Sequence, residues 1–148
     1  MPDCIRASTR MRSFVAAVVL AGAATVASAA DPISVVYHLN DGVAQAQRAI
    51  VNIRNHLNAE PSTRIVVVTH GRGIDFLLEG AKNEQGQEFS AAIGELSGRG
   101  VQFRVCNNTL VGRDIPKDKV AMEATIVQSG VAEVASLQAQ ERFAYLRP

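Results

Sequence analysis

Short apolar runs alternate with segments of helical periodicity along the chain after residue 32. Three of the runs are rich in β-branched residues and predict buried strands at 33–39, 64–69 and 101–106. Apolar residues recurring at steps of three and four predict helices at about 43–59, 90–99 and 130–140. A short helix is predicted to begin at 74–78, and Pro116 suits the first turn of a helix at 116–122. Two further short strands are predicted at 124–127 and 143–146.

Strands that alternate with helices favour right-handed βαβ crossovers and a mainly parallel sheet. The sequence therefore predicts an α/β fold, a three-layer α/β/α sandwich with a mainly parallel sheet of about five strands. The polar segment 80–87 predicts an exposed loop, and either Asn40 or Asp41 is placed to cap the helix that follows it.

The first 29 residues have the pattern of a cleaved secretory signal peptide. A positive leader with Arg6, Arg10 and Arg12 precedes an apolar run at 14–26. Small residues then suit cleavage before Ala30, and the run is shorter than the ~20 residues that span a bilayer, which disfavours an uncleaved membrane anchor. We therefore expect a single domain at 30–148, exported to the periplasm of a Gram-negative cell.

Loss of the leader changes the charge and the cysteine content. It removes three arginines and one aspartate, so the formal net charge of +1 for the whole chain becomes −1 for the mature protein. With neither a basic excess nor a cluster of Lys and Arg, nucleic acid and anionic membranes are poor partners. Of the two cysteines in the sequence, Cys4 is removed and Cys106 remains.

A single cysteine cannot form an internal disulfide. Cys106 could fill space as a small apolar side chain, form a disulfide between subunits, or act as a nucleophile, and the choice decides whether the protein is an enzyme. Arg104 lies two residues earlier on the same face of the predicted strand. Its guanidinium, together with backbone amides after the strand, would favour the thiolate.

Polar or reactive residues follow three of the predicted strands. Ligands of open parallel sheets bind at the carboxyl ends of the strands, so these residues should meet at one edge. The sequence therefore predicts Cys106 as a catalytic residue and a binding site made up of Asn40, Asp41, His70, Gly71, Arg104 and Asn107.

Other chemical motifs are weak. The histidines His38, His56 and His70 have no paired ligand spacing such as CxxC or HExxH, so neither a metal site nor a cofactor is expected. His56 is interpreted as a surface residue and His38 as an interior one. Gly71-Arg72-Gly73 lacks the third glycine of a dinucleotide fingerprint and predicts a tight turn.

Several segments, in this order and spacing, resemble the DsrE/DsrF-like family over about residues 33–147. They are Tyr37-His38-Leu39-Asn40-Asp41, Val68-Thr69-His70-Gly71-Arg72-Gly73-Ile74, Val105-Cys106-Asn107-Asn108-Thr109-Leu110, Ser129-Gly130-Val131-Ala132-Glu133 with Gln138, and Phe143-Ala144-Tyr145-Leu146. The resemblance implies a five-stranded parallel α/β/α fold and assembly into trimers or hexamers.

In sulfur-relay members of that family a cysteine carries sulfur as a persulfide, and Cys106 resembles the corresponding position. The resemblance thus implies a sulfur-carrier or thiol-handling protein that meets a sulfur donor or acceptor protein or a small sulfur compound. Relay members work in the cytoplasm, whereas this chain is predicted to be exported, so sulfur transfer to tRNA is not implied. The alternative is a non-catalytic oligomeric module that binds a small ligand or a partner and in which Cys106 is structural.

Overall fold

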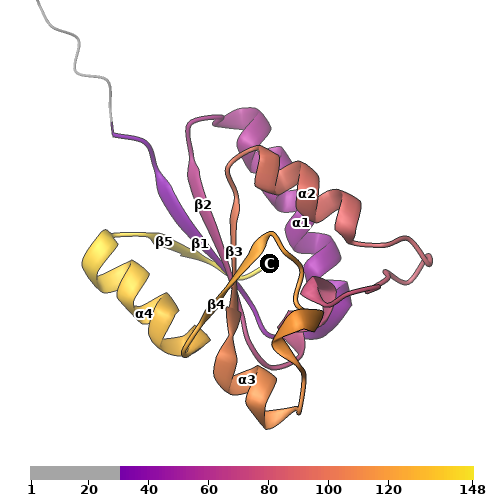
Figure 1. Ribbon diagram of the computed structural model, residues 1–148. Coiled ribbons are helices and arrows are strands. Elements are labelled where there is room, and N and C mark those ends of the chain that lie inside the picture. Colours follow the sequence, from indigo (N-terminus) through magenta and orange to yellow (C-terminus); the bar gives the residue numbers. More distant parts are fainter. Residues whose placement is uncertain (1–30) are drawn as a thin grey trace, which may run out of the picture. The chain divides into compact units, whose positions relative to one another are not determined.

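The computed structural model describes residues 31–148. The predicted signal peptide lies outside the described residues, so export and the domain boundary at Ala30 remain predictions. The described part of the chain is a five-stranded sheet with helices on both faces (Figure 1). No helix within residues 31–148 is long and apolar enough to cross a membrane.

All neighbouring strands of the sheet run parallel. The strands are β1 (Ser34–Leu39), β2 (Arg64–Thr69), β3 (Gln102–Cys106), β4 (Ala124–Val127) and β5 (Ala144–Leu146). Their order across the sheet is β4-β3-β2-β1-β5. The predicted α/β/α sandwich with a five-stranded parallel sheet is therefore confirmed.

The two faces of the sheet are covered unequally. The helical elements are α1 (Gly42–Ala59), η1 (Gly71–Leu77), α2 (Ser90–Gly98), α3 (Asn107–Gly112), η2 (Lys117–Lys119) and α4 (Gly130–Glu141), of which η1 and η2 are 3₁₀ helices. Helices α1 and α2 pack on one face, and α4 packs on the other (Figure 1).

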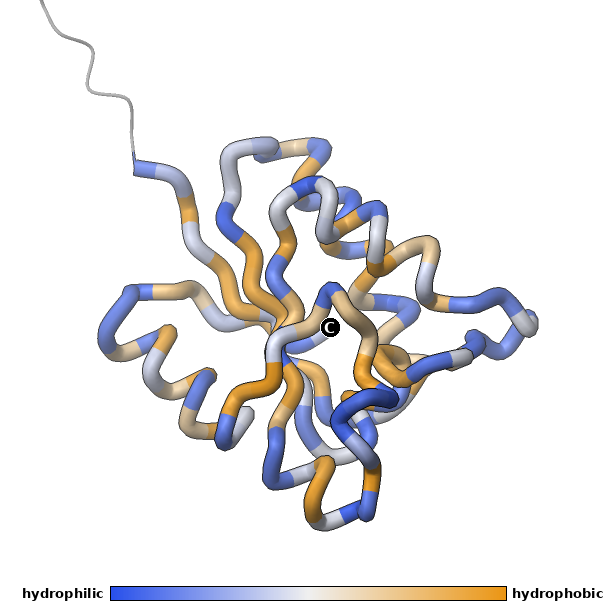
Figure 2. Tube along the Cα trace, viewed as in Figure 1, coloured by the Kyte–Doolittle hydropathy of each residue, from blue (hydrophilic) through white to orange (hydrophobic). Residues whose placement is uncertain are grey.

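Alternation along each strand divides the apolar side chains between two cores, because successive residues point to opposite faces. Val35, Tyr37 and Phe103 belong to the larger core beneath α1 and α2. The smaller core beneath α4 is made up of Val36, Val66, Val68, Val134, Leu137 and Phe143. In Figure 2 the strands are largely apolar along the middle of the sheet. One helix cannot cover a whole sheet, which leaves room for polar side chains on the α4 face.

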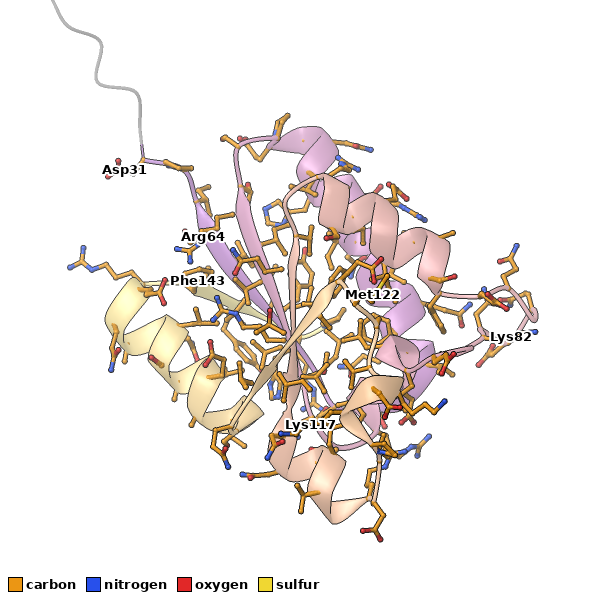
Figure 3. The ribbon with its side chains drawn as sticks, viewed as in Figure 1. Asp31, Arg64, Lys82, Lys117, Met122 and Phe143 are labelled. Carbon is orange, nitrogen blue, oxygen red and sulfur yellow. The ribbon has the colours of Figure 1, made fainter. Side chains whose placement is uncertain are left out.

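Helix α4 connects strands at opposite edges of the sheet, because β4 lies at one edge and β5 at the other. Beyond the end of α4, Phe143 lies beneath the guanidinium of Arg64, 4.9 Å from it, and the two are neighbours in Figure 3. Arg64 also binds Glu141, with 3.1 Å between nitrogen and oxygen. These contacts fix the C-terminal end of α4 against the start of β2.

The helix predicted at 116–122 is wrong. Only the single turn η2 forms, Pro116 is in an extended conformation, and Met122 is 97% exposed. The segment pairs instead with the end of η1: the amide of Glu79 donates to the carbonyl of Lys119 and the amide of Ala121 donates to that of Leu77. Backbone pairing to a distant segment has replaced the local helix.

The start of α1 is stabilised differently from the prediction. Asp41 is at the N-cap position, but its side chain makes no capping hydrogen bond. Instead the buried Gln45 side chain reaches back, and its Oε1 accepts hydrogen bonds of 2.9 Å from the amides of both Asn40 and Asp41. Gln45 therefore satisfies the end of β1 and the start of α1 together.

Two other segments complete the comparison with the predicted elements. The polar loop between η1 and α2 is largely exposed, as predicted, and projects from the body of the domain (Figure 2). Helix α3 was not predicted. It begins directly after β3, so the chain turns from strand into helix at Cys106.

Candidate functional site

The carboxyl ends of the three central strands bring His38, His70 and Cys106 to the α4 face of the sheet. His38 and Arg104 flank Val68 in one row across β1, β2 and β3. His70 and Cys106 come two residues after Val68 and Arg104, and alternation returns them to the same face. The sequence predicted that His70 and Cys106 would meet at this edge, but it interpreted His38 as an interior residue.

Gly130, the first residue of α4, lies between Cys106 and His70. A Cβ atom at Gly130 would be 3.2 Å from the Cβ of Cys106, 3.2 Å from the Cβ of His70 and 3.1 Å from the Thr69 carbonyl oxygen. The helix start can approach the strand ends this closely because residue 130 has no side chain. The positive end of the α4 dipole is thereby placed at the thiol.

Cys106 is 3% exposed and lies between the start of α3 and Gly130 at the start of α4. Burial raises the pKa of the Cys106 thiol. Hydrogen bonds from the amide of Gly130, the hydroxyl and amide of Thr109 and the amide of Asn108 outweigh burial and lower the pKa below its ordinary value of 9.0. The site therefore favours the thiolate, the nucleophilic form of cysteine.

Thr109 is oriented by a neighbouring loop. The amide of Gly71 donates a 3.0 Å hydrogen bond to the Thr109 Oγ1. Since that oxygen accepts from Gly71, its own hydrogen is available for the sulfur of Cys106, in agreement with the side-chain hydrogen bond that lowers the thiol pKa. Gly71 has a φ of +56°, a conformation that glycine adopts without strain.

Replacing Thr109 with valine is expected to raise the pKa of Cys106, because it removes a donor and leaves a side chain of similar shape. A hydrogen bond to a charged group is worth about 1.5–3 kcal/mol, so the thiolate fraction at neutral pH should fall by about tenfold or more. Ultraviolet absorbance of the thiolate across a pH titration would measure the change. An unchanged titration midpoint would show that Thr109 does not act on the sulfur.

The guanidinium of Arg104 is committed to other partners. It forms an ion pair with Glu133 of α4 and donates a 2.9 Å hydrogen bond to Gln102 Oε1. The groups that lower the Cys106 pKa are main-chain amides and a threonine hydroxyl rather than this cation. Arg104 thus holds α4 against β3, the placement on which the Gly130 amide depends.

Of the other predicted binding residues, Asn107 lies beside the thiol, whereas Asn40 and Asp41 lie between β1 and α1. Asn107 begins α3 directly after the thiol, and its Oδ1 is buried without a hydrogen-bond partner among the described residues. Asn40 lies at the end of β1, where its Oδ1 accepts a 3.0 Å hydrogen bond from Arg147. Asp41 is exposed at the start of α1. Gly71 lies between these two places. It is close to the carbonyl oxygen of Asn40, and its amide donates a hydrogen bond to the Oγ1 of Thr109.

A hydrogen-bonded chain of two histidines and a tyrosine lies beside the thiol. The Nε2 atoms of His38 and His70 are 2.6 Å apart, and the His38 Nδ1 is 2.7 Å from the hydroxyl of Tyr145. Burial lowers the pKa of His38, and the nearby His70 and Arg147 lower it further. Burial and Arg147 likewise lower the pKa of His70. Both imidazoles therefore favour the neutral form.

His56 belongs to a different part of the molecule. Its Nδ1 lies 3.1 Å from the hydroxyl of Tyr37 at the α1 face, so it is a partner of a core tyrosine rather than a solvated surface group. Within residues 31–148 no three His, Cys, Asp or Glu side chains gather closely enough to bind a metal ion.

The larger hollows of the surface lie elsewhere. A cavity of about 470 Å³ lies between α1 and the loop before α2, where Arg54, Gln85 and Phe89 are among its lining residues. Cys106 itself is buried at the sheet edge, away from this cavity. The arrangement suits covalent attachment of a group of a few atoms rather than the enclosure of a large ligand.

Sequence reasoning missed Thr109, Gly130, Tyr145 and Arg147. The strand alternation could have paired His38 with His70 and Cys106, because all three are on the same face by counting in twos. The contribution of Gly130 has no local signal, since it depends on where α4 crosses the sheet.

Comparison with known proteins agrees with this fold. The model of the DsrE/DsrF-like family matches residues 49–148. The protein of unknown function MTH1491 from Methanobacterium thermoautotrophicum is 32% identical, with a TM-score of 0.70 over 78% of this chain and 99% of that chain. The ychN protein from E. coli has the same coverage, a TM-score of 0.63 and 14% identity, which shows the fold alone. No curated protein matches the sequence.

The family model covers more than half of the chain, and its match extends from within α1 through β2, β3, Cys106, α4 and β5. It therefore includes every element that contributes a donor to the thiol. The chain belongs to the DsrE/DsrF-like family.

Proposed function

We propose that this protein carries sulfane sulfur as a persulfide on Cys106. Membership of a family with a sulfur-relay-type function supports the class of chemistry. The observation that carries the proposal is the close approach of the start of α4 to Cys106 at Gly130, which together with Thr109 and Asn108 lowers the pKa of the thiol. Donors that stabilise a thiolate also stabilise a persulfide anion, because both place negative charge on sulfur in the same pocket.

The loading step is a thiol–disulfide type of exchange. The Cys106 thiolate attacks a sulfane sulfur of the donor, a new S–S bond forms at Cys106, and the S–S bond of the donor breaks. With thiosulfate, the leaving group is sulfite, which takes the electron pair of the broken bond. With a polysulfide, the leaving group is the polysulfide shortened by one sulfur atom. Neither reaction needs a metal or an external oxidant.

The burial of Cys106 selects the class of donor. A thiol that is 3% exposed can be reached by a small anion more readily than by a cysteine on the surface of another protein. The amides around the sulfur also favour an anionic reactant. We therefore assign loading to small inorganic sulfur compounds, with Asn107 and His70 orienting the incoming group.

The proposed setting is the periplasm, reached through the predicted signal peptide, and the proposed form is a homotrimer or homohexamer. Exposed apolar side chains near the site are consistent with association between subunits: Val111 of α3 and Val131 of α4 are both exposed. The net charge of −1 on the mature chain gives no reason to expect nucleic acid or a membrane as a partner.

Replacing Cys106 with alanine is expected to abolish sulfur loading. Mature protein cleaved before Ala30 would be exposed to polysulfide or thiosulfate, and its intact mass would be measured by mass spectrometry with and without reductant. The wild-type protein should gain one sulfur atom that reductant removes, and Cys106→Ala should gain none because the attacking thiolate is absent.

Two results would support the rival roles of Cys106. A folded wild-type protein that gains no sulfur would leave Cys106 as a packing residue in a ligand-binding or partner-binding module. A covalent dimer that disappears with reductant and is absent in Cys106→Ala would indicate an intersubunit disulfide.

A further inference from the structure

The chain Tyr145–His38–His70 connects the surroundings of Cys106 with the protein surface. Tyr145 lies on the edge strand β5 and is 40% exposed, whereas the Cβ of His70 packs against Gly130 beside Cys106. The links of 2.7 Å and 2.6 Å are both short enough for proton transfer along hydrogen bonds. We propose that these three side chains form a proton relay for sulfur transfer from Cys106, an inference that rests on the function proposed above.

Two neutral arrangements of protons satisfy the observed contacts. In the first, His70 Nε2 donates to His38 Nε2, His38 Nδ1 donates to the Tyr145 oxygen, and His70 Nδ1 has a free lone pair. In the second, Tyr145 donates to His38 Nδ1, His38 Nε2 donates to His70 Nε2, and His70 Nδ1 carries a proton. A shift of protons along the chain converts one arrangement into the other without leaving a charge on either ring.

The ring of His70 is oriented for this role. Its Nε2 is occupied by His38, so Nδ1 is the nitrogen left for a reacting group. Nδ1 is separated from Cβ by one ring carbon, and that Cβ lies against the same Gly130 position as the Cβ of Cys106. Nδ1 is therefore the ring nitrogen closer to Cβ, the atom of His70 that lies with Cys106 at the Gly130 position.

Transfer of sulfur to an acceptor thiol releases a proton that must be removed. The outer sulfur of the loaded persulfide first takes a proton from water. His70 Nδ1 then takes the proton from the acceptor thiol, and the resulting thiolate attacks that protonated outer sulfur. A new S–S bond forms on the acceptor, the bond between the outer sulfur and the Sγ of Cys106 breaks, and Cys106 leaves as a thiolate with the electron pair. The relay passes one proton from Tyr145 to water, so atoms and charge balance.

The charges around the pair favour a relay of neutral rings. Arg147 lies on the β5 side and disfavours a second positive charge. On the β3 and α4 side, Arg104 and Glu133 neutralise each other. Arg113 binds Asp75 and the Gly71 carbonyl near the following loop. A cation close to the pair also argues against a metal ion between the two Nε2 atoms, and the described residues supply no third ligand.

The test is single-turnover transfer from loaded protein to free cysteine, followed across a pH series. His38→Gln, His70→Gln and Tyr145→Phe would be compared with His56→Gln, a control on the α1 face. All four should load one sulfur atom, His70→Gln more slowly than the wild type because His70 orients the incoming group, so each variant is loaded to completion before transfer is started. We expect transfer about 100-fold slower in His70→Gln and His38→Gln, the usual scale of general acid–base catalysis, and an intermediate loss in Tyr145→Phe.

The pH profile separates a relay from a purely structural role. The wild-type rate should already be high below the ordinary thiol pKa of ~8.5, whereas the histidine variants should gain rate only as the acceptor ionises by itself. If the variants load and transfer at the rate and with the profile of His56→Gln, the relay is overturned and the persulfide function stands. A wild-type protein that never loads overturns both. A wild-type transfer rate equal in H₂O and D₂O would overturn the relay without any substitution.

Discussion

Replacing Gly73 with alanine is expected to destabilise the fold by at least about 3 kcal/mol, the upper range for overpacking. A Cβ atom at this position would lie 2.2 Å from the carbonyl oxygen of Leu39, 2.4 Å from its carbonyl carbon and 2.6 Å from the amide nitrogen of Asn40. These are main-chain atoms at the end of β1, held by the sheet and by Gln45, so they cannot move aside without breaking hydrogen bonds.

The effect would be measured as the shift in the midpoint of chemical denaturation. Gly98→Ala is a matched control, because Gly98 ends α2 and has no atom within 4 Å of the position of an added Cβ. Alanine there should leave stability unchanged or raise it by up to ~1 kcal/mol, through its greater helix propensity. Equal stabilities of the two variants would contradict the close approach of η1 to β1.

Replacing Gly130 with alanine is expected to reduce the reactivity of Cys106 by about tenfold or more while the domain remains folded. The added Cβ would press on the Thr69 carbonyl and on the Cβ atoms of Cys106 and His70, at 3.1–3.2 Å. Relief requires the start of α4 to move by a few tenths of an ångström. That movement lengthens the hydrogen bond from the Gly130 amide to the sulfur, which raises the pKa of Cys106.

The sulfur loading rate at neutral pH, followed by intact mass, would measure this loss. Gly112→Ala is the control, because Gly112 ends α3 near the same edge of the sheet and an added Cβ there meets no atom within 4 Å. Its loading rate should match that of the wild type. If Gly130→Ala loads as fast as Gly112→Ala, the amide of residue 130 does not control the thiol.

The fold could be predicted from the sequence because its central strands are buried on both faces and read as continuous β-branched runs, as in Ile65-Val66-Val67-Val68. The prediction of a helix start at Pro116 failed because a distant segment decided the conformation, through the pairing of 119–121 with the end of η1. It also missed α3, whose opening Asn-Asn-Thr residues have low helix propensity.

Of the candidate site, the sequence could predict only the residues that directly follow the predicted strands. Cys106, His70 and Asn107 follow from the rule for parallel sheets, and the structure brings them together. Gly130 and Tyr145 could not be found in this way. Their positions depend on the path of α4 from one edge of the sheet to the other, a property of the whole topology rather than of any segment.

That path has a consequence for the order in which the protein acquires its chemistry. Strands β1, β2 and β3 pair between neighbouring segments of the chain, whereas β5 pairs with β1 across most of the described residues, and pairing over so long a separation is slow to form. Tyr145 reaches His38 only when this pairing occurs. A nascent or partly unfolded chain in which β5 has not yet paired therefore lacks the contact between Tyr145 and His38, and complete folding is itself the step that joins the two histidines to the tyrosine.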